Sequence, residues 1–310
     1  NITNLDFKNF LNQNNNNFDD IIIDFNKIFL NSGIFFIIKS KAKLNISLIH
    51  DTSDNFTIFQ NNFINFKKKC EVTIEDNFNF INNSINNINY NINVEEDATI
   101  KHNIFQNFAN SNKLYLTSNT VCEKNASYSQ NTYNFSDGFV RNFHHVKLNG
   151  EFSKASLKGC FFLKDKNICS NKTNIKHNAE NCISDQTYKG ILNDHSKASY
   201  YSNTFVSENA QKTEGYQLSK GILLTDNCSF FSKPELRIFA DDVKCSHGST
   251  IGPVDESALY YLRSRGINKK EAMKMIISSL DMLTYIHQQE NVVRENISAI
   301  EQEIAEVKYS

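Results

Sequence analysis

The chain has 310 residues, a mass of 35.6 kDa and a formal net charge of −1, with 40% hydrophobic and 22% charged residues. This composition is typical of a soluble globular protein with one large domain or two ordinary ones, and it excludes a strongly basic nucleic-acid-binding chain. No apolar run approaches the roughly 20 residues of a membrane-spanning helix.

Residues 1–20 are polar and Asn-rich, so we expect a weakly structured segment without a signal peptide there. Residues 21–252 are predicted to form many short β-strands, because runs of β-branched and aromatic residues are separated by Asn, Asp, Ser and Gly. The predicted strands include 21–25, 34–38, 44–49, 56–59, 72–74, 113–116, 139–146, 156–162, 200–206 and 221–224.

A polar residue followed by alanine recurs near the start of successive predicted strands. Small residues suit the corners of stacked coils, where neighbouring coils approach closely, so the recurrence favours a β-solenoid. The intervals between the alanines are irregular, and on this ground alone a sandwich or a barrel stays open. The pairs are Asn125-Ala126, Lys154-Ala155, Asn178-Ala179, Lys197-Ala198 and Asn209-Ala210.

Residues 253–310 are predicted to form a small α-helical domain. Asp255 is a candidate N-cap of a first helix, and Gly266 can end that helix in the left-handed conformation. Asn268 and Glu271 form a capping-box-like pair that begins a second helix. One apolar stripe is expected on it, at Ala272, Met275, Ile276, Ser279, Leu280, Leu283 and Ile286.

Seven cysteines are widely spaced and include no Cys-x-x-Cys pair. This pattern predicts reduced thiols in the cytoplasm and argues against a disulfide framework or a zinc ribbon. His144 and His145 are adjacent, so a strand would point them to opposite faces. His177 and Cys182 flank a predicted polar turn. Three further thiols are expected to be core residues, namely Cys160, Cys169 and Cys228.

Cys245 and His247 are two residues apart, so a strand would project both from one face, with Asp241 on that face if the strand is regular. A thiolate beside an imidazole suits a soft metal, an iron–sulfur cluster or a sulfur-handling site. Two ligands are fewer than the four of a closed metal site, so a cluster here would be shared with another chain. A packed thiol beside a structural histidine is the alternative.

The segment 234–252, which reads PELRIFADDVKCSHGSTIG, resembles the SufB/SufD family of iron–sulfur cluster assembly proteins. Asp255 and the run 260–267, YYLRSRGI, continue the resemblance. Within the family, the run 244–248, KCSHG, is similar to the SufD branch. A looser family pattern is matched further upstream, at His177, Asp185-Gln186, Lys189, Thr213-Glu214-Gly215 and Leu223-Leu224.

The resemblance implies a mainly β fold, with a right-handed parallel β-helix core followed by the helical domain. It implies a non-catalytic subunit that pairs with SufB through the β-helix, with a homodimer allowed when the chain is alone, and no nucleic-acid or membrane partner. A transient iron–sulfur cluster shared with SufB would lie at Cys245 and His247, with no tightly bound cofactor in the isolated chain. The SufC ATPase would dock on the C-terminal helices, at Tyr261, Leu262, Arg263, Arg265, Gly266 and Ile267.

Two other functions remain open at this point. The chain could be the main cluster scaffold, as SufB is, although it lacks a Cys-rich N-terminal segment. It could also be a carbohydrate-active β-helix enzyme, a class that needs a row of acidic residues, which the sequence does not show. SufD proteins usually carry a longer helical N-terminal region, so the chain is either natively short there or a fragment.

Overall fold

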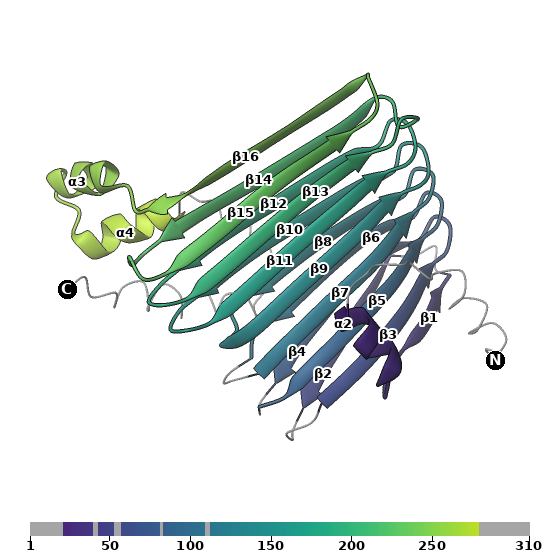
Figure 1. The fold of residues 1–310 in the computed structure, drawn as a ribbon, viewed down its shortest axis with the longest axis horizontal. Coiled ribbons are helices and arrows are strands. Elements are labelled where there is room, and N and C mark those ends of the chain that lie inside the picture. Colours follow the sequence, from purple (N-terminus) through teal and green to yellow (C-terminus); the bar gives the residue numbers. More distant parts are fainter. Residues whose placement is uncertain (1–20, 40–42, 53–56, 81–82, 109–111, 279–310) are drawn as a thin grey trace.

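The computed structural model describes residues 21–39, 43–52, 57–80, 83–108 and 112–278. Two eight-stranded parallel sheets make up most of this structure, and the chain alternates between them, so that two successive strands make one coil (Figure 1). Sheet A contains β1 (Phe35–Ile38), β3 (Thr57–Phe66), β5 (Ile85–Val94), β7 (Asn112–Cys122), β9 (Gly138–Leu148), β11 (Ile168–His177), β13 (Lys197–Val206) and β15 (Ser229–Ile238). Sheet B contains β2 (Leu44–Thr52), β4 (Glu71–Phe80), β6 (Thr99–Gln106), β8 (Ser127–Asn134), β10 (Lys154–Leu163), β12 (Ile183–Leu192), β14 (Thr213–Leu223) and β16 (Val243–Pro253).

Each strand pairs in parallel with the strand two places before it, as when Val72 of β4 pairs with Ile100 of β6. The predicted parallel β-solenoid with C-terminal helices is therefore confirmed. Successive side chains of a strand face alternately inward and outward. In β4 every second residue is buried, and the inward side chains of both sheets form one core cluster that runs from Ile38 to Phe230.

The corner from sheet A to sheet B is built the same way in coil after coil. One residue takes a positive φ of 55° to 63°, which non-glycine residues rarely adopt, and the next residue is small and buried. The corner repeats every 27 to 31 residues. Its positive-φ residues are Lys69, Asp97, Asn125, Phe152, Asn181 and Lys212, and the small residues after them are Cys70, Ala98, Ala126, Ser153, Cys182 and Thr213.

The predicted strand at 21–25 is wrong, because this segment forms helix α2 (Ile21–Ile28) on the outer face of sheet A. Ile23 and Asn26, three residues apart, face the sheet and are buried. The Asn26 side chain donates to the backbone carbonyls of Gln60 at 3.0 Å and of Asn87 at 2.7 Å. The helix is therefore fixed by hydrogen bonds to β3 and β5 that a short apolar run does not reveal.

The two C-terminal helices are α3 (Glu256–Ser264) and α4 (Lys269–Ser278), and their predicted caps are confirmed. Asp255 Oδ1 accepts the backbone N–H groups of Ser257 at 2.9 Å and of Ala258 at 3.1 Å. Gly266 has a φ of +86°, and Asn268 Oδ1 accepts the N–H of Glu271 at 2.9 Å.

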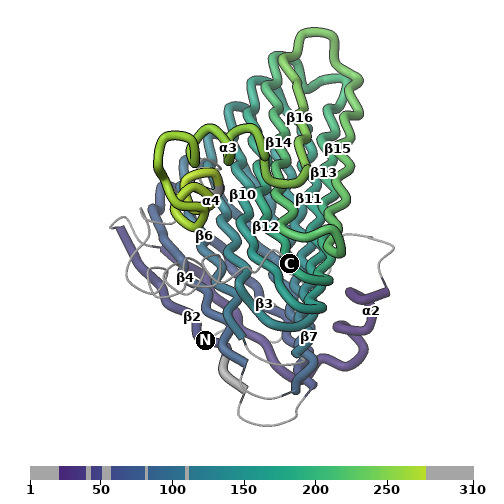
Figure 2. The backbone as a smooth tube through the Cα atoms, turned by 90° about the vertical axis from the view of Figure 1, so that its left-hand side faces the viewer, coloured from purple at the N-terminus to yellow at the C-terminus, as the bar shows by residue number. Residues whose placement is uncertain are grey.

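These helices pack on the outer face of sheet B, while α2 lies on the opposite side of the solenoid (Figure 2). The buried side chains of α4 are Ala272 and Met273, whereas Met275 is 49% exposed, so this member of the expected apolar stripe does not pack against the sheet. The buried face of α4 packs against side chains of sheet B, namely Tyr133, Cys160, Phe162 and Ile191. Four further members of the expected stripe lie outside the described residues, namely Ser279, Leu280, Leu283 and Ile286.

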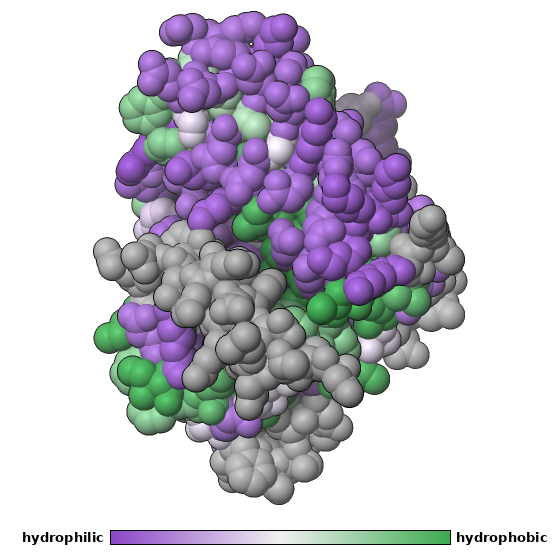
Figure 3. Space-filling view, turned by 90° about the vertical axis from the view of Figure 1, so that its right-hand side faces the viewer, coloured by the Kyte–Doolittle hydropathy of each residue, from purple (hydrophilic) through white to green (hydrophobic). Residues whose placement is uncertain are grey.

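The surface of the later coils at the sheet A to sheet B corners is mainly hydrophilic, as the upper part of Figure 3 shows. None of the described helices is long and apolar enough to cross a lipid bilayer. The β-solenoid ends at Pro253, and α3 begins three residues later. Residues 1–20, expected to be weakly structured, lie outside the described part of the chain.

Candidate functional site

Cys245 and His247 lie on β16, the last strand of sheet B, which forms a free edge among the described strands. Their register partners on β14 are Gly215 and Gln217, which are buried and face inward. Cys245 and His247 therefore both face the interior of the solenoid. Because β15 ends sheet A in the same coil, no further coil of the described structure covers them.

The thiol of Cys245 is half-buried above Gly215. A Cβ atom placed on Gly215 would lie 3.2 Å from Cys245 Sγ, so glycine leaves the room that the sulfur occupies. Around it lie Val206, Ala210 and Ala240, which form a small apolar cluster. Burial raises the pKa of the Cys245 thiol, and a hydrogen bond with the Gly215 backbone opposes that rise only in part. A metal ion would have to displace the thiol proton before the sulfur could bind it.

His247 is exposed at the end of the solenoid, with the buried amide of Gln217 beneath it. Asp241 does not share this face, because it lies in a bend before β16 begins at Val243. The expectation that Asp241 joins the pair is therefore wrong. Within the described residues there is no group of three or more His, Cys, Asp or Glu side chains that could hold a metal ion. Cys245 and His247 thus offer two donors in an incomplete site.

The free edge of β16 adds a second feature to this end of the molecule. An edge strand presents unpaired backbone N–H and C=O groups, which readily pair with another chain. The uncovered inward face and the free edge together form a surface suited to another β-structure.

The six residues expected to contact a C-terminal partner lie on and after α3. Tyr261, Arg263 and Arg265 are exposed, and the Arg265 guanidinium lies 5.2 Å from the centre of the Tyr261 ring. Leu262 and Ile267 instead pack against the apolar cluster between the helices and sheet B. Gly266 makes the turn between α3 and α4.

The other histidines and cysteines singled out from the sequence serve the packing of the solenoid. His144 points inward, with Nδ1 2.8 Å from Ser118 Oγ, and His145 points outward against Asn174 at 3.2 Å, which confirms their opposite faces. His177 lies 2.8 Å from Ser184 Oγ. All but Cys245 of the cysteines are buried, including Cys160, Cys169 and Cys228, as expected.

A buried triad of Asp76, His50 and His102 in the early coils was not predicted from the sequence, because its members are far apart along the chain. Asp76 of β4 is fully buried, with Oδ1 2.8 Å from His50 Nε2 and Oδ2 3.3 Å from His102 Nε2. The phenol oxygen of Tyr90 lies 3.1 Å from His50, and that of Tyr128 lies 3.1 Å from His102. Burial raises the pKa of Asp76, but the hydrogen bonds and charges of the two histidines outweigh it and lower the pKa to about 2.

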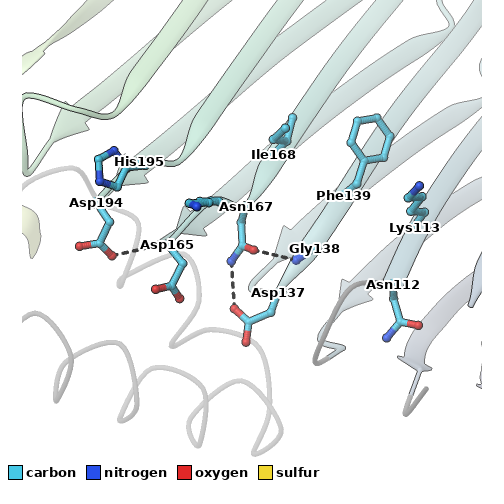
Figure 4. Close-up of a pocket in the computed structure, with 11 residues that line it drawn as sticks. Asn112, Lys113, Asp137, Gly138, Phe139, Asp165, Asn167, Ile168, Asp194 and His195 are labelled. Atoms are coloured by element: carbon cyan, nitrogen blue, oxygen red, sulfur yellow. Dashed lines mark hydrogen bonds between the residues drawn. The ribbon is translucent and has the colours of Figure 1, made fainter. Parts of the chain in front are cut away.

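A cavity of about 770 Å³ lies at the other corner, where strands of sheet A begin (Figure 4). Its carboxylates hold the corners together: Asp194 accepts the backbone N–H of Asp165 at 2.9 Å, and Asp137 accepts the side-chain amide of Asn167 at 3.0 Å. None of the residues predicted from the sequence to act in function lines it. We therefore assign these aspartates a structural role.

Comparison with known proteins gives one consistent match. A family model described as "SUF system FeS cluster assembly, SufBD core domain" matches residues 48–280. The iron–sulfur cluster assembly protein SufD of Escherichia coli is 31% identical over 211 residues, which cover 67% of this chain and 50% of that protein.

Two further relatives extend the comparison. A SufBD family protein of Synechocystis is 26% identical over 224 residues, which cover 69% of this chain and 49% of the relative. SufD of Plasmodium falciparum is 26% identical over 191 residues, which cover 60% of this chain and 13% of that protein. The chain spans about half the length of the Escherichia coli and Synechocystis relatives.

Proposed function

This chain belongs to the SufBD core family of the SUF iron–sulfur cluster assembly system, and we propose that it acts there as a non-catalytic scaffold subunit of the SufD type. The observation that carries the proposal is the pair Cys245 and His247 on the uncovered inward face of the last coil. A nascent cluster is the cargo of this site, held transiently and passed on. The free thiols of the chain suit a reducing compartment such as the cytoplasm.

A SufB-type partner supplies the remaining ligands in this proposal. Cys245 and His247 offer a sulfur and a nitrogen donor, whereas a cluster iron needs further ligands. The free edge of β16 lets a strand of the partner continue the sheet, which would bring its ligands over the last coil. A half-buried thiol of raised pKa stays protonated until the partner and the metal arrive, which protects it from premature reaction.

The SufC-type ATPase docks, in this proposal, on the exposed side of α3. Tyr261, Arg263 and Arg265 extend into solvent from a helix whose other side is anchored to sheet B. A rigidly anchored helix can transmit a movement of the ATPase to the solenoid. ATP hydrolysis belongs to that partner.

The test co-expresses the chain with SufB-type and SufC-type proteins and measures complex formation, then iron and sulfide per complex after anaerobic reconstitution. Cys245→Ala and His247→Ala are each expected to lower cluster yield to about half or less while the complex stays intact, because each removes one ligand. Ser246→Ala is the matched control, since Ser246 lies between them but faces outward. Full cluster yield from both variants would overturn the role of this pair.

The docking proposal has its own readout. Arg263→Glu combined with Arg265→Glu is expected to abolish co-purification with the ATPase and to leave pairing with the SufB-type partner unchanged. Lys270→Glu is the control, because Lys270 is an exposed cation on the neighbouring helix α4. Retention of the ATPase by the double variant would contradict docking on α3.

A further inference from the structure

The charged residues on the outer face of sheet A are almost all basic over its last four strands. Strands β9, β11, β13 and β15 contain a single acidic residue, Glu235, and it pairs with Arg237 at 2.7 Å. All seven basic residues of these strands occupy outward positions, in a chain whose net charge is −1. We call this surface the basic face; its cations are Arg141, Lys147, Lys172, Lys176, Lys197, Lys233 and Arg237.

The outer face of sheet B does not share this excess of cations. It pairs cations with acids across neighbouring strands, as in Lys158 with Asp185 at 3.7 Å and Lys244 with Glu214 at 3.3 Å. A general abundance of lysine would place cations and acids alike on both sheets. The basic face is therefore a property of one surface.

Some cations of the basic face lie directly beside other cations. Lys147 of β9 and Lys176 of β11 are direct register partners, and like charges directly opposite each other destabilise a sheet. Burial lowers the pKa of Lys147, and the charge of Lys176 lowers it further. Within the described residues no carboxylate pairs with Lys172, Lys176 or Lys233. Because these like charges destabilise the free chain, binding of a ligand of opposite charge would stabilise it.

Aromatic rings hold these lysines in place. The Lys172 ammonium lies 4.4 Å from the centre of the Phe143 ring, and that of Lys176 lies 5.0 Å from the centre of the Phe205 ring. The lysines thereby occupy the ring faces on which nucleobases would stack, which argues against a nucleic-acid platform.

A separate pair of rings is open to contact beside these lysines. Tyr201 and Phe231 lie 5.6 Å apart, and Tyr201 stands in register between Lys172 and Lys233. Tyr201 is 39% and Phe231 55% exposed. This is an apolar contact point flanked by cations.

We propose that the basic face docks an acidic polypeptide segment of a partner protein. Carboxylates of that segment meet Lys172 and Lys176, which are about 13 Å apart along β11, and one apolar side chain lies against Tyr201 and Phe231. Four residues of an extended peptide span the same distance. The face lies on the outside of sheet A, whereas the proposed cluster site uses the inward face and edge of sheet B. The docking of this segment is therefore an additional function.

The experiment measures binding of a short fluorescein-labelled polyglutamate peptide with one central phenylalanine to the full chain, by fluorescence anisotropy. The double variant Lys172→Glu and Lys176→Glu is expected to weaken binding at least about tenfold. The control reverses two corner lysines, Lys68 and Lys124, and is expected to change the affinity by less than about twofold. Phe231→Ser is expected to weaken binding of this peptide but not binding of an all-glutamate peptide. Far-ultraviolet circular dichroism checks that each variant is folded.

Three outcomes would overturn the proposal. Equal weakening by the corner control would mean that the peptide senses only net charge. Tighter binding of an oligothymidylate than of the peptide would make the face a nucleic-acid surface. Peptide binding that appears only after deletion of residues 1–20 would mean that this chain's own segment is the occupant.

Discussion

Replacing Asp76 by asparagine is expected to lower the free energy of unfolding by about 2 to 4 kcal/mol at neutral pH. The Asp76 carboxylate is fully buried between His50 and His102, which reach its two oxygens at 2.8 and 3.3 Å. Asparagine keeps the shape of the side chain but removes the charge that faces both imidazoles. The histidines would then share a single acceptor oxygen in an interior without compensating solvent.

The pKa of Asp76 sets the lower end of this range. Its fall from 3.8 to about 2 corresponds to about 2 kcal/mol in favour of the folded state. Because the pKa is depressed on folding, this stabilisation is complete above the unfolded value near 4, and it is lost as the pH falls through about 2. Between pH 4 and 2 the wild-type chain should therefore lose more stability than the Asp76→Asn variant.

Urea unfolding followed by far-ultraviolet circular dichroism measures the difference, since the chain contains no tryptophan. The matched control is Asp185→Asn, because Asp185 lies on the outer face of sheet B and is 3.7 Å from Lys158. An exposed pair of this kind contributes little, so the control should change stability by less than about 0.5 kcal/mol. An Asp76→Asn variant as stable as the control would refute the view that the triad is a charged, stabilising unit.

Three further predictions concern packing, capping and thiol reactivity. Gly159→Ala should lower the free energy of unfolding by about 1 to 3 kcal/mol, because the added Cβ would overlap the buried ring of Tyr188. Gly252→Ala, with open space around it, should be nearly neutral, and urea unfolding compares the two. Asp255→Ala should lower stability by about 1 kcal/mol through loss of the α3 cap, and unchanged proteolysis of the C-terminal helices would contradict this. Cys245 should react with iodoacetamide before the six buried thiols, and its rate should keep rising above the usual cysteine pKa, since burial raises that value; mass spectrometry against pH measures both.

Local chemistry predicted the β-strands and favoured a solenoid without excluding a sandwich or a barrel, and the family resemblance of residues 234–267 implied the parallel β-helix. The period of the solenoid could not be predicted. The pair Asn125-Ala126 is a true corner, with Asn125 at positive φ and Ala126 buried behind it. Ala155 and Ala198 instead lie inside strands of the two different sheets. Counting all such alanines as one series mixed corners with strand positions and hid the repeat.

The local geometry of the candidate site followed from residue spacing, whereas contacts between coils did not. Two residues two apart on a strand share a face wherever the strand lies, so Cys245 and His247 were placed correctly relative to each other. The contacts of Asp76 with His50 and His102 depend on the exact register of three coils. That register is set by corner lengths, which vary by a few residues and carry no obvious sequence signal.

Within the part of the chain that the structure describes, the last coil, formed by β15 and β16, is stabilised from one side only. In a stacked repeat each unit exchanges contacts with its neighbours alone, so local opening is cheapest at the ends of the stack. Amide hydrogen exchange should therefore be faster in β16 than in β10 at the centre. A protein that adds a strand to this edge turns the terminal coil into an internal one, and it would slow that exchange while it holds Cys245 and His247 in a fixed geometry. The affinity for the partner and the rigidity of the Cys245–His247 pair would then both report the same coupling free energy.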